Sequence, residues 1–222
     1  MPQSHRNLLR LIDLAKEPSS EKRRELLREV TDLFMEAPQD HSATQTEQFG
    51  DILGTVAREM EMEVRQTLAT RLASVPNAPH ALIVQLANDE INVARPVLTQ
   101  SVVLRDSDLI ALAKLQTQDH LHAIAGRKTV SAAVSDALVE RGDDRVLVRL
   151  ASNDGAELSR DAMEVLADKA ETVEPLRRPM VTRADIPPDL LNQMFFAVSS
   201  ELRRVIMSRM ENVDPSVIDG AI

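Results

Sequence analysis

Amphipathic segments with the spacing of α-helices recur along this sequence, and this pattern restricts the possible folds more than any other feature. In residues 19–38, apolar side chains share one helical face while charged side chains occupy the other. Residues 5–17 and 46–60 show the same periodicity. We therefore predict an all-α fold, with an apolar helix face in residues 19–38 made of Leu26, Leu27, Val30, Leu33 and Phe34.

From residue 60 onward, one amphipathic segment returns several times. Its key apolar positions are 29, 28, 37 and 44 residues apart: Val64, Val93, Leu121, Leu158 and Leu202. Further short amphipathic segments lie between these copies, so the repeated unit is a helical hairpin of a length typical of α-solenoids. We predict an irregular α-solenoid of antiparallel helix pairs over residues 61–222, with residues 1–60 as N-terminal helices packed on it. A non-repetitive helical bundle is the alternative.

Two glycines lie four residues apart in the amphipathic segment 46–60. Gly50 and Gly54 either let a neighbouring helix approach closely or are defects that each cost up to about 1 kcal/mol. The sequence leaves both interpretations open.

The composition fits helix-on-helix packing in a water-soluble protein. Apolar residues make up 43% of the chain and charged residues 27%, but aromatic residues only 2%. The core must therefore consist of Leu, Val, Ile, Met and Ala, which suits helices better than a β-sandwich. No apolar run is long enough for a transmembrane helix. We expect a cytoplasmic protein that does not contact membranes.

Charge and cysteine content exclude several classes of function. The formal net charge is −9, which opposes binding to nucleic acid or to anionic lipid. Cysteine is absent, so disulfides, thiolate catalysis and cysteine-based zinc sites are excluded. The chain also has no Trp or Tyr on which single-stranded bases could stack.

Three stretches of the sequence carry a resemblance to a known family: "LANDEINVARPVL" (86–98), "HLHAIAGRKTVSAAVSDALVERGD" (120–143) and "LASNDGAELS" (150–159). Together with their surroundings, over about residues 60–190, they resemble domain of unknown function 2336, an uncharacterised bacterial family. The resemblance implies HEAT-like helical repeats. It implies no activity, so no catalytic residue is carried over.

The stretch that looks most like chemistry is Asn88-Asp89-Glu90. It has a near-copy at Asn153-Asp154, and a helix cap is repeated in this way more readily than a catalytic centre. Asp154 and Glu157 have the spacing of a capping box. We therefore predict that both stretches cap helices, and that Pro96 bends the helix that follows the first.

No set of residues with the spacing of a reactive site is present. His120 and His122 are two residues apart, so they point to different helix faces and do not form a metal site. Phosphate-binding and nucleophile-elbow motifs are missing from the sequence. We predict no catalytic, cofactor-binding or metal-binding residues, and expect that the protein is not an enzyme.

The candidate partner-binding residues are cations in the second half of the chain. They could form a basic strip for an acidic or phosphorylated segment of another protein. Alternatively, they pair with nearby acids: Glu174, Asp185, Asp189, Glu201 and Glu211. The candidates are Arg127, Lys128, Arg177, Arg178, Arg183, Arg203 and Arg204, with Arg209 close by.

The function predicted from these observations is a non-enzymatic scaffold or adaptor that binds another protein. The apolar face of the last helix, residues 201–213, also suggests a homodimer. Two alternatives stay open: a helical-repeat protein that binds or repairs nucleic acid, and a small-molecule enzyme with a pocket between helices.

Overall fold

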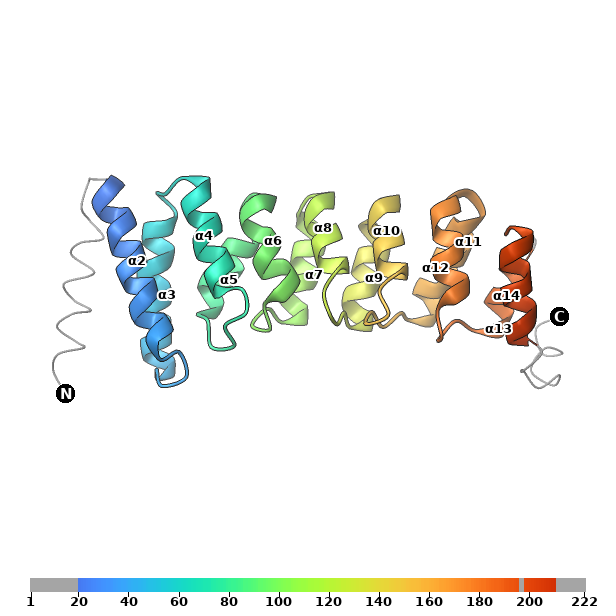
Figure 1. Cartoon of the computed structure of the whole chain (residues 1–222), viewed down its shortest axis with the longest axis horizontal. Helices are drawn as coiled ribbons and strands as arrows, with labels where there is room; N and C mark the ends of the chain where they lie inside the picture. Colours follow the sequence, from blue (N-terminus) through green and yellow to red (C-terminus); the bar gives the residue numbers. More distant parts are fainter. Residues whose placement is uncertain (1–19, 196–197, 211–222) are drawn as a thin grey trace. The chain divides into compact units, whose positions relative to one another are not determined.

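The computed structural model describes residues 20–195 and 198–210 as helices joined by short connections (Figure 1). Within these residues the only β-type pairing is one isolated parallel bridge between Val130 and Ala156. The predicted all-α class is confirmed. The helix predicted at residues 5–17 lies outside the described residues. Among the described helices, none combines the length and the apolar content that are needed to cross a membrane.

Packing divides the chain into two compact units, Met1–Leu112 and Ala113–Ile222. The predicted change at residue 60 from N-terminal helices to repeats stays a prediction. The first unit contains α2 (Ser20–Glu36), α3 (Ala43–Ala57), α4 (Met62–Leu72), α5 (His80–Ala87), α6 (Ile91–Gln100) and most of α7 (Asp106–Leu115). The second contains α8 (Gln118–Ala125), α9 (Ala132–Arg141), α10 (Asp144–Ala151), α11 (Arg160–Thr172), α12 (Glu174–Thr182), α13 (Pro188–Met194) and α14 (Ser200–Met210).

Within each unit, helices contact the helix two places further along the chain. In the first unit α3 packs on α5, and α4 packs on α6. In the second unit α8, α10, α12 and α14 pack in succession, and so do α9, α11 and α13. Each unit therefore has an even-numbered row and an odd-numbered row of helices, as Figure 1 shows within each unit.

The helix α2 follows the predicted apolar stripe, with one exception. Four of the five predicted side chains are buried, whereas Leu33 is 38% exposed. At the end of the helix, the ring of Phe34 stacks on His41 with centroids 5.3 Å apart. Phe49 contacts both rings. Half of the phenylalanines in the chain therefore lie in one small cluster between α2 and α3.

Of the two interpretations of the glycines in α3, close approach is confirmed. A Cβ atom built on Gly50 would lie 2.6 Å from Cβ of Pro79, which precedes α5. One turn later, the carbonyl oxygen of Gly54 accepts a hydrogen bond from Nε2 of Gln85 at 3.1 Å. The missing side chains therefore let α5 pack directly against the backbone of α3.

Two helices, one in each unit, share an Arg-Pro-x-x-Thr sequence. α6 continues through Pro96 and α12 through Pro179. In α6, Oγ1 of Thr99 donates to the carbonyl oxygen of Arg95 at 2.8 Å. In α12, Oγ1 of Thr182 donates to the equivalent carbonyl of Arg178 at 2.9 Å. Both helices therefore continue past an internal proline, and in each a threonine hydroxyl binds the carbonyl of the residue before that proline.

Candidate protein-binding surface

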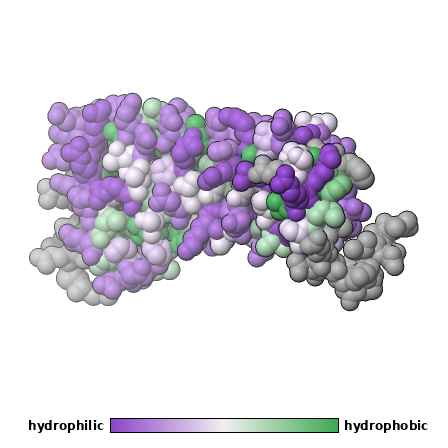
Figure 2. Space-filling view, turned by 45° about the vertical axis from the view of Figure 1, so that its right-hand side comes forward, coloured by the Kyte–Doolittle hydropathy of each residue, from purple (hydrophilic) through white to green (hydrophobic). Residues whose placement is uncertain are grey.

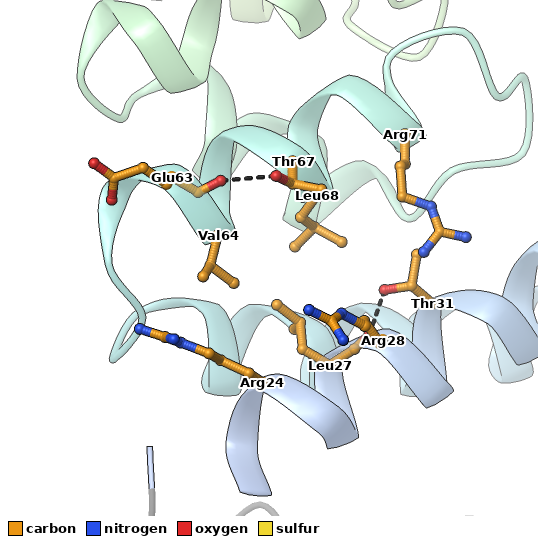
Figure 3. A pocket seen from close by; sticks show the side chains of 9 residues that line it. All are labelled: Arg24, Leu27, Arg28, Thr31, Glu63, Val64, Thr67, Leu68 and Arg71. Carbon is orange, nitrogen blue, oxygen red and sulfur yellow. Dashed lines mark hydrogen bonds between the residues drawn. The ribbon is translucent and has the colours of Figure 1, made fainter. Parts of the chain in front are cut away.

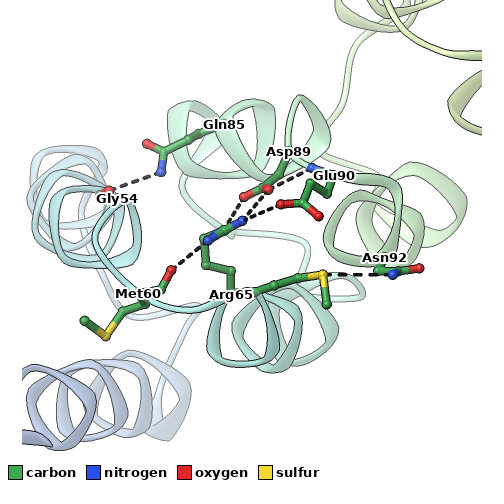
Figure 4. A network of polar contacts seen from close by, with 8 residues as sticks. Gly54, Met60, Arg65, Gln85, Asp89, Glu90 and Asn92 are labelled. Atoms are coloured by element: carbon green, nitrogen blue, oxygen red, sulfur yellow. Dashed lines mark hydrogen bonds and ion pairs between the residues drawn. The ribbon is translucent and has the colours of Figure 1, made fainter. Parts of the chain in front are cut away.

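Asn88-Asp89-Glu90, the stretch that most resembled a reactive site, lies in a connection between helices that is linked to a second connection (Figure 4). Arg65, in α4, donates from Nε and Nη2 to the two carboxylate oxygens of Asp89, at 2.6 and 2.8 Å. Its Nη1 also donates to the carbonyl oxygen of Met60 at 2.6 Å. The hydrogen bond to Asp89 is the largest influence on Arg65 and raises its pKa above the ordinary value. Arg65 therefore links the connection that precedes α4 to the connection that precedes α6, and it occupies both carboxylate oxygens of Asp89. We call such a link between two connections a joint.

The predicted capping roles are wrong in detail. Glu90 is the N-cap of α6, but its side chain accepts no hydrogen bond from the helix. Asp89 accepts from the backbone N–H of Glu90 at 2.7 Å, and otherwise binds Arg65. In the near-copy, α11 begins at Arg160 with Ser159 as its N-cap, so Asp154 and Glu157 form no capping box.

Asn153, the key residue of that near-copy, also fixes a joint. Its Nδ2 donates to the carbonyl oxygens of Ala125 and Arg127 at 2.9 and 2.8 Å. Its Oδ1 accepts from the N–H of Gly155 at 2.9 Å. The repeated Asn-Asp pair therefore ties one hairpin to the next, by side-chain contacts that differ between the two copies.

The histidines do not assemble a metal site in the described part of the chain. His120 is 3% exposed, and its Nδ1 lies 2.8 Å from Oγ1 of Thr117. His80 pairs with Asp108 at 2.8 Å, at the starts of α5 and α7. Across residues 20–195 and 198–210, no three His, Asp or Glu side chains are grouped as metal ligands would be.

Arg183, a predicted partner-binding residue, is buried instead. Only 5% of the residue is exposed. Its guanidinium donates to the carbonyl oxygens of Asn153 and Ala156 at 3.1 and 2.8 Å, and to both carboxylate oxygens of Asp185. Burial alone would raise the pKa of Asp185, but the hydrogen bond from Arg183 and its charge lower that pKa below the ordinary value. Arg183 therefore cross-links the fold and is not available at the surface.

Three more of these arginines bind backbone carbonyls. Arg177 donates to the carbonyls of Ala170 and Glu171 at the end of α11. Arg209 donates to the carbonyl of Val181 at 2.6 Å. Arg203 donates to the carbonyl of Val198 and lies over the ring of Phe195. The contacts of Arg177 and Arg209 satisfy carbonyls in the last turns of α11 and α12, which lack an intrahelical partner.

The remaining candidates are mostly exposed. The side chains of Lys128, Arg178 and Arg204 are exposed and have no hydrogen bond or ion pair to another described residue. Arg127 is half-buried. Arg149, on α10, was not among the predicted residues, but its side chain is exposed and equally unpaired within the described residues. Its position four residues after the exposed Arg145, on an amphipathic helix, could have identified it.

Three of these unpaired arginines lie on successive helices of one row. Arg149 is on α10, Arg178 on α12 and Arg204 on α14, and each of these helices packs on the next. α10 and α12 have row neighbours on both sides and odd-numbered helices behind them. The side chains of Arg149, Arg178 and Arg204 are all exposed. We call Arg149, Arg178 and Arg204 the arginine line.

The two rows of the second unit carry opposite charge. The even-numbered helices α8, α10, α12 and α14 contain seven arginines and four acidic residues. The odd-numbered helices α9, α11 and α13 contain seven acidic and three basic residues. The chain is acidic as a whole, with a net charge of −9, so the positive row is a local feature. The potential near this row is therefore more positive than the net charge of the chain suggests.

The rest of the surface offers little apolar area. On the face drawn in Figure 2, hydrophilic residues dominate and hydrophobic residues form small separate groups. The large apolar residues that are exposed in the described chain are scattered: Leu33, Val102, Leu115, Val165 and Met207. Met207, on α14, is 49% exposed, so the homodimer predicted through this helix stays a prediction.

Comparison with known proteins identifies a family and no closer relative. Residues 93–222 match a family described as an uncharacterised protein conserved in bacteria (DUF2336). The match covers more than half of the chain, and it begins and ends later than the range of about 60–190 that carried the resemblance. No curated protein and no solved structure matches the chain.

Proposed function

This chain belongs to the uncharacterised bacterial family DUF2336, and from its structure we propose that it is a non-enzymatic scaffold that binds an acidic segment of another protein. The binding face is the even-numbered row of the second unit. The arginine line, Arg149, Arg178 and Arg204, supplies the contacts to the partner's carboxylates or phosphates.

The single observation that carries this proposal is the opposite charge of the two rows in the second unit. Several arginines of the even-numbered row are occupied with backbone carbonyls, but the arginine line is exposed and has no partner among the described residues. Charged groups with no internal partner are the ones that a binding partner reaches without breaking an existing contact.

The proposal includes an irregular HEAT-like α-solenoid as the architecture. The contacts between helices two places apart, within each unit, support it. In a solenoid, such contacts produce extended faces on which a partner segment can lie. The proposal also places the protein in the cytoplasm, and the absence of cysteine is compatible with that location.

A protein partner is favoured over nucleic acid because the positive row is flanked by an acidic one and the chain has a net charge of −9. The negative charge of the chain as a whole opposes the approach of a duplex, which is itself a large polyanion. An acidic peptide segment is narrow enough to follow the positive row alone.

Site-specific photo-crosslinking in living bacteria tests the proposal. A crosslinking amino acid at position 178, on the even-numbered row, is expected to capture a discrete protein. The matched control places it at position 161, since Asp161 is exposed on the odd-numbered helix α11. Adding Arg149→Glu and Arg204→Glu to the protein with the crosslinker at position 178 is expected to abolish the product. Equal capture from position 161, or no protein product from position 178, would contradict the proposal.

A further inference from the structure

A second recognition feature lies in the first unit, where α2 and α4 leave a groove between them (Figure 3). Its volume is about 190 Å³. The apolar part of its lining is formed by Leu27 of α2 and by Val64 and Leu68 of α4. Leu27 and Leu68 are buried, and Val64 is half-buried, so these side chains form a floor that is partly open to solvent.

Arginines line the rim of this groove. Arg24 pairs with Glu61 at 2.6 Å, and Arg71 pairs with Asp32 at 2.6 Å. The side chain of Arg28, between them on α2, is exposed and has no hydrogen bond or ion pair with another described residue. Figure 3 shows its guanidinium in the space between the two helices, close to Leu27 and Thr31. Glu63 of α4 also lines the groove, but Figure 3 shows its carboxylate pointing away from Leu27 and Arg28. The groove therefore combines an apolar floor with the unpaired guanidinium of Arg28.

The size of the groove limits what it can hold. Sites for metabolites and cofactors usually enclose about 300–1,000 Å³, so this groove is small for a substrate. A cavity of about 150 Å³ holds a benzene-sized group, so 190 Å³ suits one large aliphatic side chain. A helix of a partner protein presents such a side chain together with a carboxylate one turn away.

We propose that the α2–α4 groove binds an acidic amphipathic helix of a partner protein, with a leucine-like side chain on Leu27, Val64 and Leu68 and a carboxylate on Arg28. This assignment rests on the proposed scaffold function but uses a separate site, in the other unit. Charge complementarity selects the occupant: a basic helix would place a cation against the unpaired guanidinium of Arg28, whereas an acidic helix offers it a carboxylate. A free anion would leave the apolar floor uncovered.

Binding of synthetic peptides to the whole chain tests this assignment. The probe is a labelled helical peptide with two leucines four residues apart, flanked by glutamates, and its binding is followed by fluorescence anisotropy. The control peptide carries lysine in place of every glutamate. The acidic peptide is expected to bind with a dissociation constant below about 1 mM, and Arg28→Glu is expected to weaken it by about tenfold or more.

Arg95→Glu is the matched control variant, because the side chain of Arg95 is also exposed and unpaired within the described residues of the first unit. It is expected to change peptide affinity by less than about twofold. Equal losses from Arg28→Glu and Arg95→Glu would overturn the assignment, since attraction would then depend only on net charge. Equal binding of the lysine peptide, or the absence of saturable binding, would also overturn it.

Methyl NMR spectra locate the bound peptide. The acidic peptide is expected to shift the methyl signals of Leu27, Val64 and Leu68, and to leave those of the buried Val97 and Leu98 in α6 unchanged. The triple variant Arg149→Glu, Arg178→Glu and Arg204→Glu separates this site from the proposed function. This variant is expected to abolish crosslinking of the partner protein at the arginine line. Binding of the acidic peptide to the α2–α4 groove is expected to persist in it.

Discussion

Arg183 and Asp185 form a two-pronged ion pair in which Nε and Nη2 of the arginine donate to separate carboxylate oxygens, at 2.8 and 2.7 Å. The arginine side chain is almost fully buried, while the aspartate reaches solvent. The same guanidinium also satisfies carbonyl oxygens near the start of the connection that leads to α11. One side chain thereby joins the connection that follows α12 to the connection that precedes α11.

Replacing this arginine should destabilise the protein strongly. Arg183→Leu leaves buried carbonyls and one edge of Asp185 without donors, and we expect a loss of about 3 kcal/mol in the free energy of unfolding. Urea denaturation measures it. Arg178→Leu, five residues earlier and exposed, is the control and should stay within about 0.5 kcal/mol of the wild type. A similar small effect from both variants would show that the Arg183 contacts contribute little.

Acid should weaken the fold through a small group of aspartates. The hydrogen bond from Arg160 lowers the pKa of Asp189. Burial alone would raise the pKa of Asp185 and of Asp108. The hydrogen bond from Arg183 nevertheless lowers the pKa of Asp185, and the contact with His80 lowers that of Asp108. These carboxylates hold protons less tightly in the folded chain than in the unfolded chain. Their stabilising contribution is therefore complete above the ordinary aspartate pKa of about 3.9, and is lost as pH falls through the lower pKa values of the folded chain.

The measurement is a series of urea denaturation curves between pH 7 and pH 2. The unfolding free energy should decline below about pH 5. Asp189→Asn should reduce the slope of that decline, because it removes one titrating group. An unfolding free energy that rises on acidification would contradict the assignment of these carboxylates.

The glycines of α3 should respond differently to the same substitution. In most helices Gly→Ala stabilises by up to about 1 kcal/mol. At Gly50 the new Cβ atom would lie 2.6 Å from Pro79, so we expect Gly50→Ala to destabilise by about 1–3 kcal/mol. At Gly54 the nearest atom is Oε1 of Gln85, at 3.0 Å on a flexible side chain, so Gly54→Ala should cost less. Thermal unfolding of both variants tests this order, and a stabilising effect of Gly50→Ala would show that α3 and α5 are loosely packed.

The joint between Arg65 and Asp89 should behave as one coupled unit. Both side chains are largely buried, and two hydrogen bonds connect them. A double-mutant cycle of Arg65→Ala and Asp89→Ala should give a coupling energy of about 1–2 kcal/mol. Arg65→Lys should be nearly as damaging as Arg65→Ala, since a lysine cannot contact both carboxylate oxygens and the carbonyl of Met60 together. Additive single effects would mean that the pair is not coupled.

The helical class followed from periodicity, because burial of a stripe such as Leu26, Val30 and Phe34 needs only local spacing. The periodicity did not predict which arginines are exposed and which are buried against backbone carbonyls. Arg178 and Arg183 are both cations near the end of α12, yet one is exposed and the other is buried against carbonyls from residues about 30 positions earlier. Only the tertiary packing decides between these roles.

The cap predictions were wrong for a related reason. Asp89 has the chemistry of a cap, but Glu90 is the N-cap of α6, and both carboxylate oxygens of Asp89 bind the guanidinium of Arg65. The groove was also missed, although Arg24 and Arg28 are spaced four residues apart, as are Val64 and Leu68. Their spacing indicates two helix faces, but not that these faces oppose each other.

The separation of charge between the two rows of the second unit has a kinetic consequence. Packed helices lie about 8–10 Å apart, so a positive and a negative layer at this distance make the unit a transverse dipole. For the acidic segment proposed as partner, this field favours an approach from the positive side. Association of the proposed partner with this unit should therefore be fast in dilute salt. It should become slower at ionic strengths above about 0.1 M, where the Debye length falls below the spacing between the two layers.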